Sequence, residues 1–316
     1  MDYCGCMKIL VPNSFPLTLD TDDEQVVYDI KADIPDEHRD AEVLVVWGNK
    51  PAKLKEIASQ LPKLKLVQTL MAGTDAILAA GFNDDAVLCG GAGLHDRTVT
   101  EHTVALTLAL VRKVPKLVAN KATHTWTWEI SGRQELATKP VTTLIGANVL
   151  IWGFGSIAQR LAPVLQTLGA NVVGAARSAG ERGGFPVVDE AHLDDELART
   201  DVLIMILPDT EHTTNALNAE RLAQLPEHAY VVNVGRGRTV DEDALVQALE
   251  CGTIAGAAID VMWHEPLPED SPLWEAPDLL ISPHAAGGRP IGADELVTHQ
   301  LRVLATGGEF RNLVAR

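Results

Sequence analysis

Three side chains suited to chemistry on a carbonyl group follow three predicted strands. Arg236, Glu265 and His284 each come shortly after an apolar run typical of a buried strand. The carboxyl ends of parallel strands meet at one edge of a sheet, where open α/β folds bind their ligands. We therefore expect these side chains to gather at that edge, although each of them alone would more often be a loop or core residue.

The three residue types are chemically complementary. A guanidinium group binds a carboxylate through two parallel hydrogen bonds, and an imidazole ring exchanges protons near neutral pH. A carboxylate beside a histidine stabilises the protonated ring, which can donate its proton to a carbonyl oxygen. Arg236 would thus hold a substrate carboxylate, His284 would donate the proton and Glu265 would tune it. Together with a hydride source, this set can reduce a 2-keto acid.

A glycine-rich turn indicates a dinucleotide site. The strand pattern at Asn148–Ile151 runs into Gly153-Phe154-Gly155-Ser156-Ile157-Ala158 and then into a helical pattern. Gly153 permits the tight turn, and Gly155 lets a pyrophosphate approach the positive end of the helix. Such glycines are often turn residues only. The complete strand–helix–strand unit, which ends at Asn171–Ala176, favours the cofactor site.

The second strand of this unit ends at Arg177-Ser178, where an NAD-binding protein normally has an acidic residue. A guanidinium group there attracts the 2'-phosphate of NADP, so we expect NADP(H) to be preferred, with NAD(H) as the alternative. Arg182 adds positive charge if its loop folds inward. Glu181 restores NAD binding if its carboxylate reaches the ribose.

Short apolar runs alternate with helical patterns along most of the chain, which predicts two doubly wound domains with parallel sheets. The predicted boundaries are 1–93 plus 288–316 for the substrate domain and 94–287 for the dinucleotide-binding domain. A long helix, Thr98–Asn120, would connect them, and a final helix, Asp294–Ala305, would pack on the first domain. The expected strands are Lys8–Val11, Val43–Trp47, Leu64–Thr69, Val87–Cys89, Asn148–Trp152, Asn171–Ala176, Val202–Leu207, Tyr230–Val234, Ile254–Ile259 and Leu279–Ile281.

Composition excludes several classes of function. The 26 Lys and Arg residues against 43 Asp and Glu give a net charge of −17, which disfavours nucleic-acid and anionic-membrane partners. The absence of a signal peptide and of a long apolar stretch predicts a cytoplasmic protein. Cys4 and Cys6 lack a second pair of ligands at zinc spacing, so we expect no metal site and assign this extension no function.

Several motifs, taken together and in this order, resemble the D-isomer-specific 2-hydroxyacid dehydrogenases, the group that contains phosphoglycerate dehydrogenase and glyoxylate/hydroxypyruvate reductase. The resemblance spans most of the chain. Its motifs are Met71-Ala72-Gly73-Thr74-Asp75, Val99-Thr100-Glu101-His102, Gly153-x-Gly155, Asn233-Val234-Gly235-Arg236-Gly237, Ala258-Ile259-Asp260-Val261, Glu265-Pro266-Leu267-Pro268 and Ser282-Pro283-His284.

The resemblance implies a role for each candidate. Arg236 would bind the carboxylate and carbonyl of the substrate, and Glu265 would pair with His284, the general acid or base. Backbone amides at Ala72 and Gly73 would also hold the carboxylate, although this segment reads equally as an ordinary turn before a helix. The residues implied to bind the cofactor are Gly153, Phe154, Gly155, Ser156, Ile157, Arg177, Ser178, Pro208, Thr213, Val234 and Asp260, the last through the nicotinamide carboxamide.

The same resemblance implies a flavodoxin-like substrate domain, a Rossmann nucleotide domain, and a homodimer formed through the helix region 98–120. Formate dehydrogenases share the architecture, but the Glu265 and His284 pair argues against them. The other alternative is a nicotinamide-sensing scaffold, similar to the corepressors of this group, without physiological turnover. The sequence does not identify the 2-keto acid, whose selection we assign to the loops at Val11–Phe15, Trp47–Asn49 and Leu94–Arg97.

Overall fold

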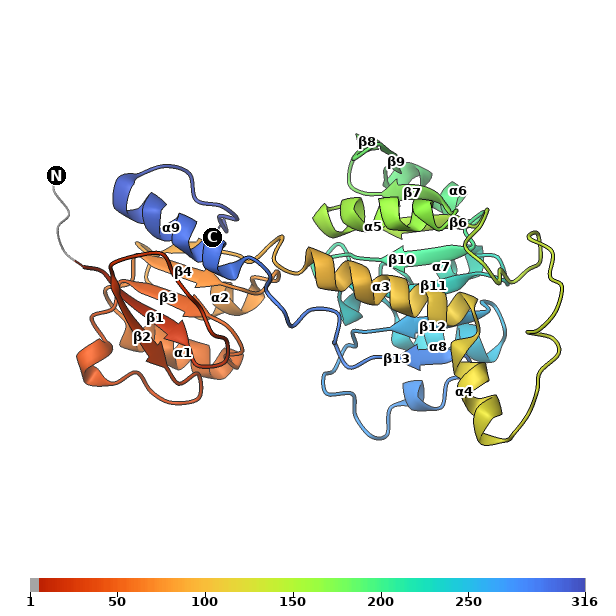
Figure 1. Cartoon of the computed structure of the whole chain (residues 1–316), viewed down its shortest axis with the longest axis horizontal. Coiled ribbons are helices and arrows are strands. Elements are labelled where there is room, and N and C mark those ends of the chain that lie inside the picture. The colour runs from red at the N-terminus through yellow and green to blue at the C-terminus, as the bar shows by residue number, and fades with distance from the viewer. Residues whose placement is uncertain (1–5, 316) are drawn as a thin grey trace. The chain divides into compact units, whose positions relative to one another are not determined.

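A computed structural model of the chain describes residues 6–315 and contains two compact units (Figure 1). The first unit comprises the chain up to His95 together with the chain from Arg289 onward, and the second comprises Asp96–Gly288. These boundaries differ by at most two residues from those expected from the sequence.

The first unit contains a parallel sheet of five strands in the order β2-β1-β3-β4-β5. This is the order of the flavodoxin-like fold. The sequence did not single out β2, because it is an edge strand that pairs only with β1 and leaves Val27 68% exposed. The strands are β1 (Lys8–Pro12), β2 (Glu24–Tyr28), β3 (Val43–Val46), β4 (Leu66–Thr69) and β5 (Val87–Cys89).

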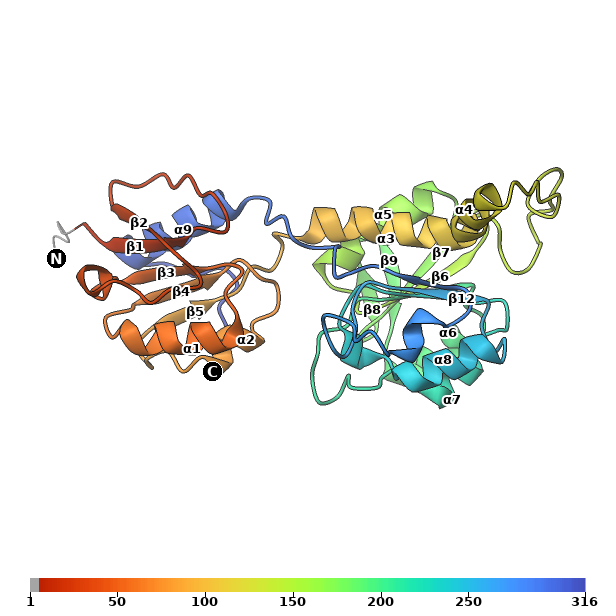
Figure 2. The same ribbon diagram turned by 90° about the horizontal axis from the view of Figure 1, so that it is seen from below.

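Helices cover both faces of this sheet, as Figure 2 shows. Alternate residues of a strand point to opposite faces, so Ile9 packs with α9 whereas Leu10 packs with α1 and α2. The final helix of the chain, which is too short to fold alone, therefore belongs to the first unit. The helices are α1 (Pro51–Gln60), α2 (Asp75–Ala79) and α9 (Ala293–Thr306).

The second unit contains an eight-stranded sheet in the order β13-β12-β11-β10-β6-β7-β9-β8. From β9 to β12 this is the Rossmann order 3-2-1-4-5-6. The sequence predicted six of these strands but not the β8–β9 hairpin, whose three- and four-residue strands are too short to show a period. The strands are β6 (Asn148–Trp152), β7 (Asn171–Ala175), β8 (Gly180–Arg182), β9 (Phe185–Val188), β10 (Val202–Met205), β11 (Tyr230–Asn233), β12 (Gly256–Ile259) and β13 (Leu279–Ile281).

Two apolar cores hold the layers of the second unit together. Val149 and Ile151 of β6 face the core beneath α3 and α5, whereas Leu150 and Trp152 face the core beneath α6, α7 and α8. Figure 2 shows these two groups of helices on opposite faces of the sheet. Their bounds are α3 (Asp96–Val111), α5 (Ser156–Thr167), α6 (Leu193–Leu197), α7 (Ala219–Gln224) and α8 (Glu242–Glu250).

The single helix predicted over 98–120 was wrong, because the structure divides this segment. Helix α3 ends at Val111, and α4 spans Val114–Ala122 after Lys113, which has a left-handed backbone with φ of 55°. The break is explained by Pro115, which lacks an amide proton and would clash with the carbonyl group of Val111 in a continuous helix. An irregular arm, residues 123–139, follows α4 and carries Trp126 and Trp128.

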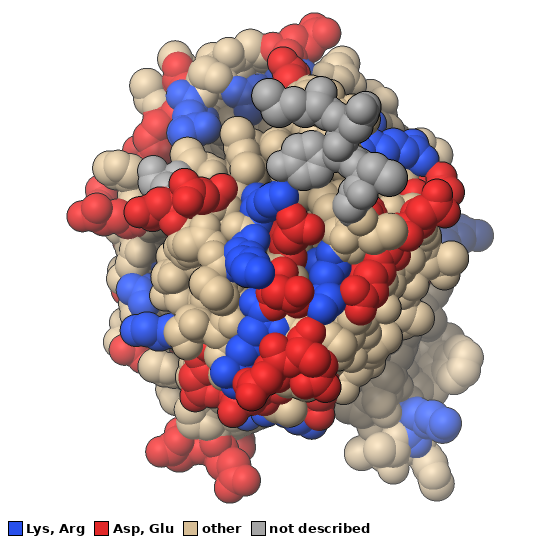
Figure 3. All heavy atoms as spheres, turned by 90° about the vertical axis from the view of Figure 1, so that its left-hand side faces the viewer, with Lys and Arg blue, Asp and Glu red and all other residues tan. Residues whose placement is uncertain are grey.

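Within residues 6–315, no helix is both long and apolar enough to cross a lipid bilayer. On the face of the first unit drawn in Figure 3, acidic and basic side chains are interspersed. Ion pairs in the first unit include Lys8 with Asp40 at 2.7 Å and Lys53 with Asp33 at 2.6 Å. On this face, the excess of acidic groups is therefore not gathered into one continuous acidic surface.

Candidate active site

The glycine turn after β6 is fixed by close packing. Gly153 has φ of 102°, and a Cβ atom there would lie 2.4 Å from the carbonyl oxygen of Ile206. Only glycine fits this approach to the segment after β10. Gly155 precedes α5 with open space around its Cα, and no side chain of the described residues caps the helix at this position. The first amides of α5 are therefore free to bind a phosphate group.

The side chain of Phe154 belongs to the core. It is 2% exposed and packs against Phe185, while Gly174 of β7 makes room for its ring. A Cβ at Gly174 would lie 2.3 Å from that ring. Phe154 can thus present its backbone to a cofactor, with its side chain anchoring the turn. Ser156 is exposed and Ile157 partly exposed at the start of α5.

Positive charge lies at the end of β7. Arg177 and Ser178 are exposed there, and the guanidinium of Arg182 folds toward them. Its Nη2 donates to the Oγ of Ser178 at 2.7 Å and to its carbonyl oxygen at 2.9 Å. Its Nη1 donates to the carbonyl oxygen of Phe154 at 3.3 Å. Two guanidinium groups therefore border the predicted ribose position, whereas Glu181 forms no ion pair with either of them in the described part of the chain.

The loop after β10 forms the opposite border of the glycine turn. Pro208 is exposed, and the hydroxyl of Thr213 donates to its carbonyl oxygen at 2.6 Å. Val234, just after β11, is 6% exposed and packs in the core under α3 and α5. The free amides at the start of α5 provide the donors that the pyrophosphate of a dinucleotide requires.

Two glycines fix the backbone on both sides of Arg236. A Cβ at Gly235 would lie 2.7 Å from the backbone of Leu207, and one at Gly237 would lie 2.0 Å from that of Met262. The buried amide group of Asn233 donates to the carbonyl oxygen of Arg236 at 3.1 Å and accepts from the amide of Gly235 at 3.1 Å. This positioning role of Asn233 was not recognised from the sequence.

Glu265 and His284 form the hydrogen-bonded pair expected from the sequence. Nδ1 of His284 lies 2.7 Å from Oε2 of Glu265, and the amide of Met262 donates to Oε1 of Glu265 at 3.1 Å. An ionised carboxylate only accepts hydrogen bonds, so Nδ1 carries a proton. Nε2 of His284 is therefore the ring nitrogen that can exchange a proton with a substrate.

Arg236, Glu265 and His284 line one cavity of about 190 Å³. The carboxyl ends of β11, β12 and β13 thus deliver the three side chains to one place. Trp263 and Arg238 also line this cavity, and the guanidinium of Arg238 lies 4.9 Å from the centre of the Trp263 ring. Sequence reasoning missed both residues. The only available signal was their position within two residues of Arg236 and Glu265.

Asp260, at the end of β12, has no exposed surface. Its carboxylate accepts hydrogen bonds from the hydroxyl of Ser282 at 2.6 Å and from the amides of Ala285 and Ala286 at 2.8 and 3.0 Å. These contacts organise the chain around His284. The predicted contact between Asp260 and a nicotinamide carboxamide stays a prediction.

Ala72 and Gly73 follow β4 in the first unit. Ala72 is exposed and Gly73 partly exposed, and neither amide donates a hydrogen bond within residues 6–315. The three loops expected to select the substrate meet through aromatic rings. The Trp47 ring stacks on His95 at 5.5 Å and meets the Phe15 ring edge-on at 6.3 Å. Phe15, Trp47 and His95 therefore form one cluster within the first unit, whereas Asp96 and Arg97 begin α3 of the second unit.

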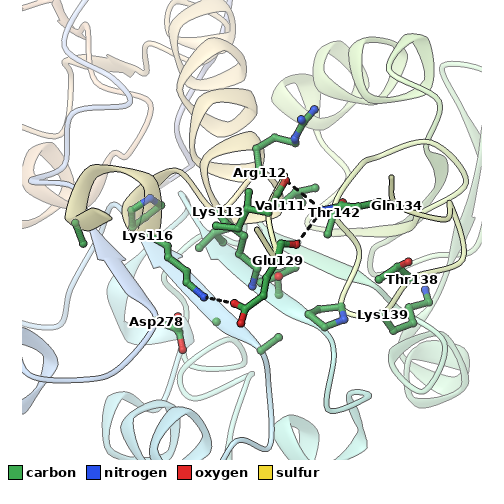
Figure 4. Close-up of a pocket in the computed structure, with 18 of the residues that line it drawn as sticks. Val111, Arg112, Lys113, Lys116, Glu129, Gln134, Thr138, Lys139, Thr142 and Asp278 are labelled. Carbon is green, nitrogen blue, oxygen red and sulfur yellow. Dashed lines mark hydrogen bonds and ion pairs between the residues drawn. The ribbon is translucent and has the colours of Figure 1, made fainter. Parts of the chain in front are cut away.

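The second unit contains a larger cavity of about 650 Å³ at the opposite edge of its sheet (Figure 4). It is bordered by α4, by the arm after it and by the amino ends of β11, β12 and β13. Lys116 points across it to Glu129, with 3.2 Å between their charged atoms. Parallel sheets bind ligands at their carboxyl ends, and none of the three predicted catalytic residues lines this cavity.

Cys4 lies outside the described residues, and Cys6 is exposed. In the part of the chain that the structure describes, no cluster of three or more His, Cys, Asp or Glu side chains has the arrangement of a metal site.

Comparisons with known proteins agree with this geometry. Residues 104–286 match the NAD-binding domain of the D-isomer specific 2-hydroxyacid dehydrogenases. The chain is 36% identical over 255 residues to an uncharacterized protein in the proB 3' region of Corynebacterium melassecola, covering 78% of this chain and 79% of that protein. It is 30% identical over 281 residues to the glycerate dehydrogenase of Methylorubrum extorquens, covering 87% and 85%.

Among solved structures, the chain resembles the NADPH-dependent glyoxylate/hydroxypyruvate reductase of Sinorhizobium meliloti, crystallised with NADP and sulfate. The TM-score is 0.82 at 25% identity, over 98% of both chains. Three findings identify the family: the matched nucleotide domain, the relatives that cover most of the chain, and the shared architecture. The chain belongs to the D-isomer specific 2-hydroxyacid dehydrogenases, which are NAD(P)-dependent oxidoreductases acting on CH–OH donors.

Proposed function

We propose that this enzyme reduces a small 2-keto acid to the D-2-hydroxy acid, with His284 as the proton donor. The observation that carries the proposal is the shared cavity of Arg236, Glu265 and His284, in which Nδ1 of His284 lies 2.7 Å from Glu265. The bound reduced nicotinamide supplies hydride to the carbonyl carbon when the cofactor is present.

Arg236 is proposed to bind the substrate carboxylate, and the contribution of the amides of Ala72 and Gly73 stays a prediction. A guanidinium group offers two parallel donors to the carboxylate and carbonyl oxygens, which fixes the orientation of the carbonyl carbon. Asn233 and the flanking glycines hold the backbone of Arg236 in place, so its side chain starts from a fixed point.

The hydrogen bond between Nδ1 of His284 and Glu265 leaves Nε2 as the nitrogen that transfers the proton. Protonated His284 donates the Nε2 proton to the carbonyl oxygen as the carbon receives hydride, and the product is the alcohol. The ring stays joined to Glu265 through its Nδ1 proton, so the neutral tautomer left after transfer is already oriented. In the oxidation direction, the same Nε2 accepts the hydroxyl proton.

The test is a panel of glyoxylate, hydroxypyruvate, pyruvate and phenylpyruvate, each assayed with NADPH and with NADH. We expect consumption of the reduced cofactor with at least one acid, and chiral chromatography should find the D product in equal amount. Failure with every acid, while the protein still binds the cofactor, would favour the nicotinamide-sensing scaffold instead. An L product would contradict the proposed stereochemistry.

NADPH is the proposed preferred cofactor. Arg177 is exposed at the end of β7, and Arg182 is bonded to Ser178 next to it. Two guanidinium groups and a hydroxyl favour a 2'-phosphate, whereas an acidic residue at this position would repel it. The related reductase of Sinorhizobium meliloti is named as NADPH-dependent.

The cofactor proposal is tested by Arg177→Asp and Arg182→Ala. We expect kcat/KM to be higher with NADPH than with NADH in the unmodified enzyme. Arg177→Asp should reverse the ratio, chiefly through the KM of the cofactor, and Arg182→Ala should reduce it. Equal efficiency with both cofactors, unchanged in both variants, would show that this end of β7 does not bind the 2' group.

A homodimer is proposed to form over α4 and the arm that follows it. Val118 is 65% exposed, and Trp126 and Trp128 are 73% and 78% exposed. Large exposed apolar side chains grouped in this way mark an interaction surface. A second copy is the proposed occupant, since the resemblance to the family implies a homodimer through residues 98–120, which include most of α4, and a twofold axis makes the same surface meet itself.

Analytical ultracentrifugation tests this assembly. We expect twice the chain mass of 33.9 kDa for the unmodified protein. Replacing Trp126 and Trp128 with serine should raise the dimer dissociation constant. A monomer at micromolar concentration would contradict the proposed dimer. A dimer that the double variant leaves unaffected would place the interface elsewhere.

A further inference from the structure

The turn that carries His284 has an unusual backbone. His284 has φ of 51°, in the left-handed region that residues with a side chain rarely adopt. Such a conformation is unfavourable by itself and persists only where the surroundings enforce it. The position of the proposed proton donor therefore depends on the contacts that hold this turn.

Asp260 holds the turn from two directions. The amide of His284 donates to the carbonyl oxygen of Asp260 at 2.7 Å, and the next two amides donate to its carboxylate. The hydroxyl of Ser282 donates to the same carboxylate at 2.6 Å. One buried side chain thus binds residues on both sides of His284, and its own orientation sets the orientation of the turn.

His102, on the second turn of α3, contacts this arrangement from outside the catalytic cavity. Its Nε2 lies 2.9 Å from Oγ of Ser282 and 3.2 Å from Oδ1 of Asp260. Because the Ser282 hydroxyl proton is directed to Asp260, Oγ of Ser282 is left to accept a hydrogen bond. Nε2 of His102 therefore carries a proton and donates to Ser282. His102 does not line the cavity that contains His284.

We propose that His102 is a positioning residue for the reaction, an inference that rests on the proposed role of His284. It links α3, whose apolar side packs against the sheet, to Ser282 and Asp260, and these residues fix the left-handed turn at His284. Glu265 contacts the imidazole ring of His284, whereas His102 acts on the backbone beneath it. The two residues thus have separable effects.

His102→Leu and His102→Gln test the proposal. The carboxamide nitrogen of glutamine can reach Ser282 and donate a hydrogen bond, whereas leucine fills the space without a donor. We expect His102→Leu to lower kcat about ten- to a hundredfold, the effect of a small misplacement of a reacting group. The pH midpoint of kcat should stay unchanged, because the bond between Glu265 and His284 remains. His102→Gln should retain most of the activity.

Ser282→Ala breaks the same link at its middle member, which bonds both His102 and Asp260. It should lower kcat in the same way, and the double variant with His102→Leu should be no slower than the slower single variant. Assays are run well below the melting temperature of each variant, so partial unfolding does not contribute. Full kcat in His102→Leu and Ser282→Ala, additive losses, or no rescue by His102→Gln would overturn the proposal.

Hydrogen exchange gives a readout that does not require turnover. The amides of Ala285 and Ala286 should exchange faster in His102→Leu than in the unmodified protein, and His102→Gln should restore their protection. If the unmodified protein reduces no 2-keto acid, the proposed function fails while this measurement still tests the link to the turn. Unchanged protection in His102→Leu would contradict the link itself.

Discussion

Two aspartates at opposite edges of the eight-stranded sheet are almost completely buried, but they hold different structures. Asp260, at the carboxyl end of β12, is 0% exposed and binds a serine hydroxyl and two backbone amides. Asp201, just before β10, is 2% exposed and binds the side chains of Lys139 and His228. The amide of Asn148 also donates to Asp201 at 2.8 Å.

The two aspartates therefore have different roles: Asp260 fixes the geometry of a turn, and Asp201 anchors segments of the chain to one another. At the carboxyl edge, Asp260 directs hydrogen bonds to a short turn and so fixes the backbone of His284. At the amino edge, Asp201 joins the end of the arm at Lys139 to the starts of two strands. We therefore expect changes at the carboxyl edge to affect turnover first, and changes at the amino edge to affect stability first.

A large loss of activity at the carboxyl edge is expected for Arg236→Lys. An ammonium group cannot reproduce the planar pair of donors, so the KM of the keto acid should rise and kcat should fall. The combined loss in kcat/KM is expected to be about a hundredfold, because a slightly misplaced substrate reacts much more slowly. Arg199→Lys is the matched control, since the exposed Arg199 pairs with the buried Glu196 outside the cavity. Steady-state kinetics with near-normal values for Arg236→Lys would place the substrate carboxylate elsewhere.

Glu265→Gln should act through the pH dependence. The protonated form of His284 loses its neighbouring anion, so reduction should persist only at lower pH, with the midpoint of kcat moved by about one pH unit or more. Glutamine keeps the size of the side chain, which separates charge from packing. An unmoved midpoint, or one moved to higher pH, would show that the pair is not coupled in turnover.

Asp201→Asn should reduce stability without a matching loss of turnover. Burial raises the pKa of Asp201, but the hydrogen bonds from Lys139, the amide of Asn148 and His228 together outweigh burial and hold that pKa below its usual value of 3.8. A lowered carboxyl pKa contributes stability above the unfolded pKa, and this contribution is lost as the pH falls through the folded pKa. We expect a loss of about 1–3 kcal/mol at neutral pH from urea unfolding.

The same measurement repeated at decreasing pH sharpens this prediction. The difference between Asp201→Asn and the unmodified protein should shrink as the pH falls below 3.8. A difference that stays constant with pH would assign the effect to packing. Loss of turnover with full stability would remove the proposed distinction between the two edges.

The sequence predicted the features that short segments encode. Apolar runs identified the strands, and the rule that parallel strands end at one edge was sufficient to bring Arg236, Glu265 and His284 together. The glycines beside Arg236 are explained only by the folded chain, where a Cβ at Gly237 would overlap the backbone of Met262. The fold was thus predictable from the apolar pattern of the sequence. The contacts that hold each catalytic side chain in place were not.

The missed features depend on contacts between distant residues. Lys139 and Asp201 are 62 residues apart, and His102 and Ser282 are 180 residues apart, so no local period reveals them. The inward fold of Arg182 depends on the β8–β9 hairpin, whose strands are too short for a pattern. The break before α4 was available in principle, because Pro115 cannot continue a helix.

The most direct test of the account compares two histidines at the two edges, each bonded to a carboxylate. His284 lies 2.7 Å from Glu265, and His228 lies 2.9 Å from Asp201. The measurement is the single-turnover rate of cofactor oxidation in His284→Gln and His228→Gln, with NADPH and the best keto acid both saturating. We predict a rate about 100- to 10,000-fold lower in His284→Gln, the range for a lost general acid, and an unchanged rate in His228→Gln. Equal rates in the two variants would contradict the assignment of His284 as the proton donor.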